Sequence, residues 1–232
     1  MILSICMIVK DEEATLARCL DCVKNLADEL IIVDTGSVDK SVEIARRYTD
    51  KVYFFDWCDD FAAARNFSFS MATGDYVMWL DADDVITDDN VEKLSELKQR
   101  DDFDVAFVKY AAAFDGDVPI MEYYRERVVR RALNLQWEGA VHEAIVPIGR
   151  VIYSDARIDH RKVKANPPMR NLRIFQKLIA SGNLLDERQK FYYGRELFYS
   201  GMYLESIAVL NDFLKGDGWV ENKIEACRTI CR

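Results

Sequence analysis

The sequence of 232 residues lacks the long hydrophobic run of a membrane-spanning helix, because no apolar stretch in it approaches roughly 18 residues. Residues 1–9 are apolar but have no basic lead-in and run directly into Lys10-Asp11-Glu12-Glu13, a pattern that predicts a first strand and no signal peptide. A basic excess is also missing, since 31 Lys and Arg stand against 40 Asp and Glu, and the net charge of −9 argues against nucleic acid as the main partner. We therefore expect a soluble, cytoplasmic protein without a transmembrane segment, at most peripheral at the inner face of the membrane.

A second Cys-x-x-Cys pair at zinc-ribbon spacing is absent as well, although the chain has six cysteines. Cys19 and Cys22 fall on the apolar stripe of an expected helix, and Cys6 falls inside the first expected strand. We interpret the cysteines as buried, reduced thiols, and a metal or disulfide role is the alternative.

The first hundred residues alternate between strand and helix patterns. Apolar runs at 2–9 and 30–33 flank a segment whose apolar residues recur at helical spacing, which predicts a strand–helix–strand unit. A short strand at 51–55, a helix at about 61–71 and a strand at 76–80 are expected to follow. Strands that are apolar throughout are buried on both faces, so the expected fold class is α/β, with a mostly parallel sheet covered by helices.

The pattern changes after residue 103. Residues 103–114 and 123–133 are expected to form strands, and no helical pattern separates them, so we predict that they pair antiparallel. A further short strand is expected at 144–148.

The last part of the chain is predicted to be entirely helical. It follows a loop signal, Asn166-Pro167-Pro168, and contains a helix, a turn at Gly201 and a second helix, with aromatic and small residues at the seam. This pattern suggests a tetratricopeptide-type repeat, and we expect two domains, 1–165 and 166–232. Because such repeats normally stack in about three or more copies, either the tail is truncated or its helical pair packs on the first domain.

The strand at 76–80 ends in Asp81-Ala82-Asp83-Asp84, three carboxylates within four positions. Carboxylates this close repel one another unless a proton or a cation neutralises them, and such clusters suit Mg²⁺ or Mn²⁺ with substrate phosphates completing the shell. Open α/β sheets bind ligands at the carboxyl ends of their strands. The cluster is therefore a candidate divalent-metal site for a phosphorylated substrate, and an Asp-rich turn before a helix N-cap is the alternative.

Three other polar residues bear on this hypothesis. Asp34 follows the second strand, where an acid in doubly wound folds often bonds a ribose or base, although a plain turn carboxylate is the alternative. Arg65 lies on the helix that leads into the acidic strand, and we expect it near the cluster unless it is a solvated arginine. Of the two histidines, we expect His160 to be an ordinary polar residue of the surface or core.

Five motifs, taken together and in this order, resemble family 2 glycosyltransferases of the GT-A fold. They are Met7-Ile8-Val9-Lys10-Asp11-Glu12-Glu13, Ile32-Val33-Asp34-Thr35-Gly36-Ser37-Val38-Asp39, Ala64-Arg65-Asn66, Gly74-Asp75-Tyr76-Val77-Met78-Trp79-Leu80-Asp81-Ala82-Asp83-Asp84 and Val141-His142-Glu143. The first four lie within residues 1–90, and the match is weaker at 100–150. The helical tail is similar to tetratricopeptide segments attached to some bacterial members of the family.

The resemblance implies a nucleotide-sugar donor, most simply a UDP-sugar, and a Mn²⁺ or Mg²⁺ cofactor. Asp83 would ligate the metal directly and His142 would complete the shell, while Asp84 would have a turn or supporting role. The donor would contact residues from four of the motifs: Val9, Glu12, Asp34, Asp39, Arg65, Asp81 and Ala82.

The resemblance also implies the reaction. Family 2 enzymes generally invert the anomeric centre in one displacement, so one carboxylate base suffices to take the proton of the acceptor hydroxyl. Glu143 is the first candidate and Glu126 the second, while Asp117, Glu122 and Glu138 stay open. We expect a hexosyltransferase whose acceptor is a saccharide, a lipid-linked molecule or a peptide presented by the helical tail, and a homo-oligomer is conceivable.

Two other functions stay open. One is a nucleotidyltransferase with the same fold and metal site, but a Gly-rich, basic signature after the first strand is missing. The other is an inactive scaffold that binds a partner through its helical tail, which the intact set of Asp34, Asp81 and Asp83 disfavours.

Overall fold

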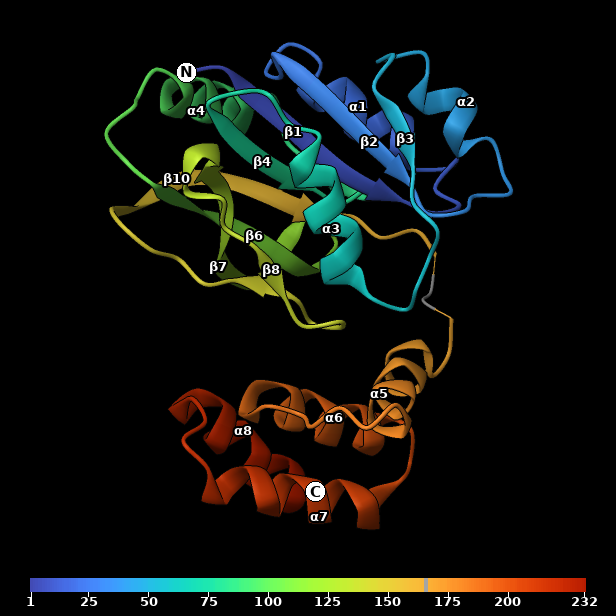
Figure 1. Ribbon diagram of the computed structural model, residues 1–232. Helices are drawn as coiled ribbons and strands as arrows, with labels where there is room; N and C mark the ends of the chain where they lie inside the picture. The colour runs from blue at the N-terminus through green and yellow to red at the C-terminus, as the bar shows by residue number, and fades with distance from the viewer. Residues whose placement is uncertain (165–166) are drawn as a thin grey trace. The chain divides into compact units, whose positions relative to one another are not determined.

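The computed structural model describes residues 1–164 and 167–232. Their contacts form two compact units (Figure 1). The sheet unit contains residues 1–58, 62–138 and 144–164, and the helical unit contains residues 167–232 together with Asp59–Phe61 and Gly139–Glu143. The predicted domain boundary lies between residues 165 and 166, outside the described residues.

Eight strands of the described chain form one sheet in the order β3-β2-β1-β4-β7-β6-β10-β5. The strands β1, β2, β3 and β4 pair in parallel, and β7 joins β4 antiparallel. The predicted α/β class with a mostly parallel sheet and an antiparallel later part is confirmed. The bounds are β1 Leu3–Val9, β2 Glu29–Asp34, β3 Val52–Phe54, β4 Tyr76–Leu80, β5 Asp84–Val85, β6 Val105–Asp115, β7 Val118–Arg130 and β10 Val151–His160.

Helices cover both faces of this sheet, because its central strands are apolar on both sides. Alternate residues of β4 show the division: Met78 packs with α1, α2 and α4 on one face, and Trp79 packs with α3 and the short β8–β9 pair on the other. The bounds of these elements are α1 Leu16–Val23, α2 Ser41–Ala45, α3 Phe61–Ser70, α4 Asp88–Lys98, η1 Arg131–Leu133, β8 Trp137–Glu138 and β9 Ala144–Ile145.

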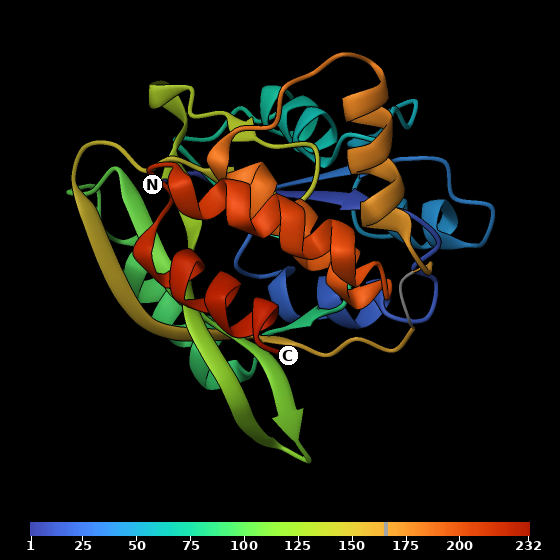
Figure 2. The ribbon, with the colours of Figure 1, turned by 90° about the horizontal axis from the view of Figure 1, so that it is seen from below.

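The later strands agree with the prediction in part. The expected antiparallel pair is confirmed as β6 and β7, which run side by side to a shared turn in Figure 2. The second strand of the pair begins at Val118 rather than 123 and ends at Arg130. The long strand β10, which pairs in parallel with β6, was not predicted, and it carries His160 at its end.

The helical unit contains α5 (Arg170–Ala180), α6 (Glu187–Tyr199), α7 (Tyr203–Lys215) and α8 (Val220–Ile230). The expected helix, glycine turn and helix correspond to α6, Gly201 and α7. A Cβ atom at Gly194 would overlap the buried Leu210 side chain, so glycine permits the close approach of α6 and α7 at this seam.

Two further expectations concern exposure. Burial of the cysteines is confirmed for Cys6 and Cys19, and Cys22 is half-buried. The prediction is wrong for the exposed Cys58, Cys227 and Cys231, which lie in a loop, on the outer face of α8 and just after α8. Within the described residues, no helix is both long and apolar enough to cross a membrane.

Candidate active site

The candidate site lies at one edge of the sheet, where the parallel strands β1, β2 and β4 end. In the register of these strands, Val9 pairs with Asp34, and Met7 pairs with Leu80 on the other side of β1. The acidic residues that follow β2 and β4 therefore come to the same edge.

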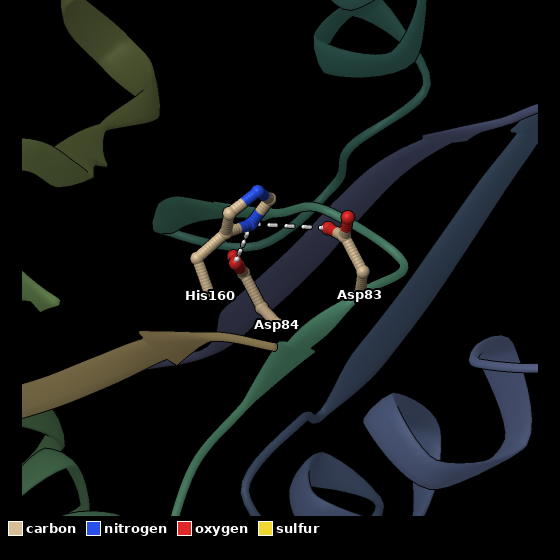
Figure 3. A group of neighbouring side chains, drawn as sticks. All are labelled: Asp83, Asp84 and His160. Carbon is tan, nitrogen blue, oxygen red and sulfur yellow. Dashed lines mark ion pairs between the residues drawn. The ribbon is translucent and has the colours of Figure 1, made fainter. Parts of the chain in front are cut away.

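Asp83, Asp84 and His160 converge at this edge (Figure 3). The His160 Nδ1 atom lies 3.3 Å from Asp83 Oδ1 and 3.5 Å from Asp84 Oδ1. One ligand atom from each of the three residues lies within 4.8 Å of the others. The Asp84 side chain is fully buried, whereas those of Asp83 and His160 are 13% and 24% exposed.

Backbone pairing produces this convergence. The Asp84 N–H donates to the Asp81 carbonyl at 3.0 Å and closes a turn, and the chain then forms β5. In the antiparallel pairing of β5 with β10, His160 stands opposite Asp84. The Arg161 N–H donates to the Asp83 carbonyl at 3.0 Å and continues the pairing into the turn.

The donor set fits a divalent cation. Burial lowers the pKa of the His160 imidazole, but the adjacent Asp83 and Asp84 carboxylates outweigh it and raise this pKa to about 10. Asp84 Oδ1 and His160 Nδ1 are buried and form an ion pair, but neither atom has a partner with hydrogen-bond geometry among the described residues. Two carboxylates and an imidazole suit Mn²⁺ and, less closely, Mg²⁺, which favours oxygen ligands.

Arg65 lies beside the first aspartate of the cluster, as the sequence predicted. Its Nη2 atom is 2.8 Å from Asp81 Oδ1, and its guanidinium contacts the rings of Trp79 and Trp137, 4.8 and 4.9 Å from their centroids. Burial raises the pKa of Asp81, but the charges of Arg65 and Arg127 outweigh it and lower the pKa to about 2. Asp81 is therefore a carboxylate at neutral pH.

The other residues predicted to bind the donor lie near the same edge. The Asp34 carboxylate accepts the N–H groups of Gly36 and Ser37 at 3.0 and 3.1 Å, and Asp39 accepts those of Glu13 and Ser41 at 3.0 and 2.8 Å. These acids order the loops after β1 and β2. Among the rest, Val9 ends β1 and accepts from Thr35, Glu12 pairs with Lys164 at 2.9 Å, and Ala82 is buried.

The predicted bases lie in different units. Glu126 is buried in the sheet unit, where its carboxylate pairs with Arg125 at 3.1 Å and its carbonyl accepts from Trp79 Nε1. Glu143 belongs to the helical unit.

His142 also belongs to the helical unit, where other contacts hold its ring. Its Nε2 atom is 2.8 Å from Glu196 Oε1, and its ring is stacked on Tyr192 with centroids 4.1 Å apart. The histidine that the structure brings to Asp83 is His160, and the metal-binding role of His142 stays a prediction.

The sequence profile of glycosyl transferase family 2 matches residues 4–154, which is more than half of the chain. The chain belongs to this family. The resemblance identified from the five motifs is therefore confirmed, and the sheet unit is a glycosyltransferase domain.

Relatives of this family 2 domain extend well beyond it. A TPR repeat-containing protein of Synechococcus elongatus is 37% identical over 143 residues, which are 61% of this chain and 35% of that protein. An uncharacterized glycosyltransferase of Rickettsia typhi is 32% identical over 114 residues, which are 48% of this chain and 39% of that protein. The chain thus matches well under half the length of these relatives.

Solved structures share the fold of the family 2 chain. S. aureus TarS 1-349 in complex with UDP-GlcNAc has a TM-score of 0.56 at 15% identity, covering 93% of this chain and 81% of that one. Glucosyl-3-phosphoglycerate synthase from Mycobacterium tuberculosis, in complex with Mn²⁺ and UDP-glucose, has a TM-score of 0.51 at 15% identity, covering 80% of each chain. These likenesses confirm the GT-A fold.

The sequence did not predict two residues of the site, His160 and Arg127. His160 was interpreted as an ordinary polar residue because β10 was not recognised, and the position of a lone histidine gains meaning only from the strand that carries it. Arg127, in β7, is fully buried and contacts Asp84 at 3.0 Å. The local sequence gives no clear signal for Arg127, because Arg125, Glu126 and Arg130 lie on the same strand end and nothing distinguishes Arg127 from them.

Proposed function

We propose that this chain transfers a sugar from a UDP-sugar to an acceptor hydroxyl in one displacement that inverts the anomeric centre. The observation that carries the proposal is the convergence of Asp83, Asp84 and His160 at the sheet edge where Asp34 and Asp81 also lie. UDP-sugars occupy the similar structures of TarS and of glucosyl-3-phosphoglycerate synthase, which supports the same donor class here.

Asp83 and His160 would hold Mn²⁺ or Mg²⁺, with Asp84 beside them. A divalent cation bound there supplies the positive charge that a diphosphate leaving group needs. Arg65, which already offers a cation beside Asp81, would face the same phosphates. His160 replaces His142 as the preferred histidine ligand because its ring nitrogen is the one that faces Asp83.

Glu143 remains the preferred base for the acceptor hydroxyl. Glu126 stays the second candidate, and its carboxylate is buried and paired with Arg125 at 3.1 Å. The acceptor is defined here only as a hydroxyl group on a saccharide, a lipid-linked molecule or a peptide. Location in the cytoplasm and any homo-oligomer stay predictions.

A thermal-shift panel tests the proposal. UDP-, GDP-, CMP- and dTDP-linked sugars are each added with and without Mn²⁺, and a ligand at about 100 times its Kd should stabilise the protein by about 2.7 kcal/mol. We expect Mn²⁺-dependent stabilisation by the UDP-sugars alone. Stabilisation by no nucleotide sugar under any metal condition would overturn the proposal and favour a scaffold.

Two histidine variants test the ligand assignment. His160→Ala should abolish the Mn²⁺-dependent part of the shift, and His142→Ala should retain it. The opposite pattern would return the ligand role to His142, as the sequence alone predicted.

A further inference from the structure

Arg127 is an arginine with no exposed surface, next to the candidate metal site. Its Nη1 atom donates to the Trp79 carbonyl at 3.1 Å and to Asp84 Oδ2 at 3.0 Å. Its Nε and Nη2 atoms are buried and have no hydrogen-bond partner within residues 1–164 and 167–232. A buried charge with unsatisfied donors is costly, so a residue that serves stability alone would more simply be apolar.

Aromatic rings fix the plane of this guanidinium. Its Cζ atom lies 3.6 Å from the centroid of Trp79 and 4.5 Å from that of Tyr110. The Tyr110 ring also contacts the His160 ring, with centroids 5.7 Å apart. Arg127 is therefore confined by rings that belong to β4 and β6, on the two strands that flank β7.

Asp84 connects Arg127 to the candidate ligands. Its Oδ2 atom accepts from Arg127 and from the Asp81 N–H at 3.1 Å, which closes the acidic turn. Its Oδ1 atom faces His160 Nδ1 at 3.5 Å, and the same nitrogen faces Asp83. A shift of the Asp84 carboxylate would thus move both the turn and the contact with His160.

We propose that Arg127 is a positioning residue: it holds Asp84 so that Asp83 and His160 present their ligand atoms to one divalent cation. This inference rests on the metal site of the proposed function. Lysine would keep the charge at this position but lacks the planar group that the rings of Trp79 and Tyr110 enclose.

The test is the affinity for Mn²⁺ alone, measured by titration with the electron paramagnetic resonance signal of free Mn²⁺. Loss of a residue that orients metal ligands typically weakens metal binding by about 10- to 100-fold, and we expect a weakening in this range for Arg127→Lys. Urea unfolding of the same samples reports the separate effect on stability.

Arg130→Lys is the matched control. Arg130 lies on the same strand, stacks on Tyr76 at 4.8 Å and pairs with Asp104 at 2.9 Å, at the end of β7 remote from the acidic cluster. We expect its substitution to lower stability without changing Mn²⁺ affinity.

The outcomes separate the two proposals. Failure of the wild-type protein to bind Mn²⁺ would overturn the metal site and this inference with it. Wild-type binding that Arg127→Lys leaves unchanged, in a folded variant, would overturn the inference alone and leave Arg127 a purely structural residue. If Arg127→Lys does not fold, Arg127→Gln, which brings no buried charge, decides by the same measurement.

Discussion

The sheet unit has two buried groups of polar residues at opposite ends of its parallel strands, and they differ in how completely their oxygens are satisfied. Glu29 begins β2 at the amino end, and Asp83 and Asp84 follow β4 at the carboxyl end. Both groups contain a carboxylate and a cationic side chain. Hydrogen bonds close the first group, whereas the ligand atoms of Asp83, Asp84 and His160 in the second group contact one another only as ion pairs.

The Glu29 carboxylate has a partner for each oxygen. It accepts from Ser4 Oγ and Lys51 Nζ, and from the N–H and Oγ1 of Thr73 at 2.8 Å each. Ser4 Oγ in turn accepts the N–H of Gly74 at 2.9 Å, where a Cβ atom would lie 2.7 Å from that hydroxyl. The group ties β1, β2 and the start of β4 together.

At the carboxyl end, Asp84 Oδ1 and His160 Nδ1 lack hydrogen-bond partners in the part of the chain that the structure describes. Unsatisfied buried polar atoms cost free energy, and they persist where a ligand provides the missing interaction. The Glu29 group therefore stabilises the sheet unit, and the acidic edge is where the proposed metal would bind.

Asp83→Asn should have the largest effect on Mn²⁺ binding and little effect on stability. Removing one charged ligand should lower Mn²⁺ affinity by about 100-fold or more, since even residues that only orient ligands account for 10- to 100-fold. Unfolding free energy without metal should change by about 1 kcal/mol or less, in the range of ordinary substitutions. Mn²⁺ titration and urea unfolding measure the two quantities, and a variant that binds Mn²⁺ as the wild type does would refute the assignment.

Glu29→Gln should show the converse behaviour. The amide loses the charge that faces Lys51 and one acceptor oxygen, so we expect a loss of about 2–3 kcal/mol in unfolding free energy. Glu43→Gln is the matched control, because Glu43 pairs with Arg47 on an exposed helix surface, where such pairs contribute about 0.5 kcal/mol. Equal losses in the two variants, or weakened Mn²⁺ binding in Glu29→Gln, would contradict the division of roles.

The contribution of Glu29 to stability should also depend on pH. Burial raises the pKa of Glu29, but its hydrogen bonds with Lys51, Ser4 and Thr73 outweigh it and lower the pKa from 4.5 to about 2. Because the pKa of Glu29 is lower in the folded protein than in the unfolded chain, the ionised carboxylate stabilises the folded state. This stabilisation is complete above pH 4.5 and is lost as the pH falls toward about 2. The difference in unfolding free energy between the wild type and Glu29→Gln should therefore shrink between pH 5 and pH 2, and a constant difference would contradict the origin of the effect.

Local patterns explain what the sequence predicted. The apolar periodicity of single elements predicts the strand–helix–strand repeats, and the rule that parallel strands end at one edge brings Asp34 and Asp81 together. Arg65 and Asp81 are only 16 positions apart, and α3 leads directly into β4.

Long-range pairing explains what it did not. His160 reaches Asp84 through β10, whose register with β6 shifts between Ser154 and Arg157 and thereby breaks the alternation that identifies a strand. Arg127 meets Asp84, 43 positions earlier in the chain, because β7 lies beside β4. Nothing in the local sequence of either residue encodes its neighbour on another strand.

A third carboxylate, Glu196, lies in the helical unit, and we expect its substitution to change stability least. Burial raises its pKa, but hydrogen bonds with His142 and Asn171, both to Oε1, outweigh it and lower the pKa, so Glu196 resembles Glu29 in the direction of its pKa shift. Glutamine keeps one acceptor oxygen, so Glu196→Gln should cost about 1 kcal/mol.

That loss should be local to residues 139–143, where His142 has a φ of +55° that a non-glycine residue adopts only when its surroundings hold it. Hydrogen exchange of these amides should accelerate in Glu196→Gln and stay unchanged in Glu205→Gln, whose carboxylate is exposed on α7. Unchanged exchange in both variants would mean that stacking on Tyr192 alone fixes the His142 ring, and that a hydrogen-bonded carboxylate can be dispensable in this protein.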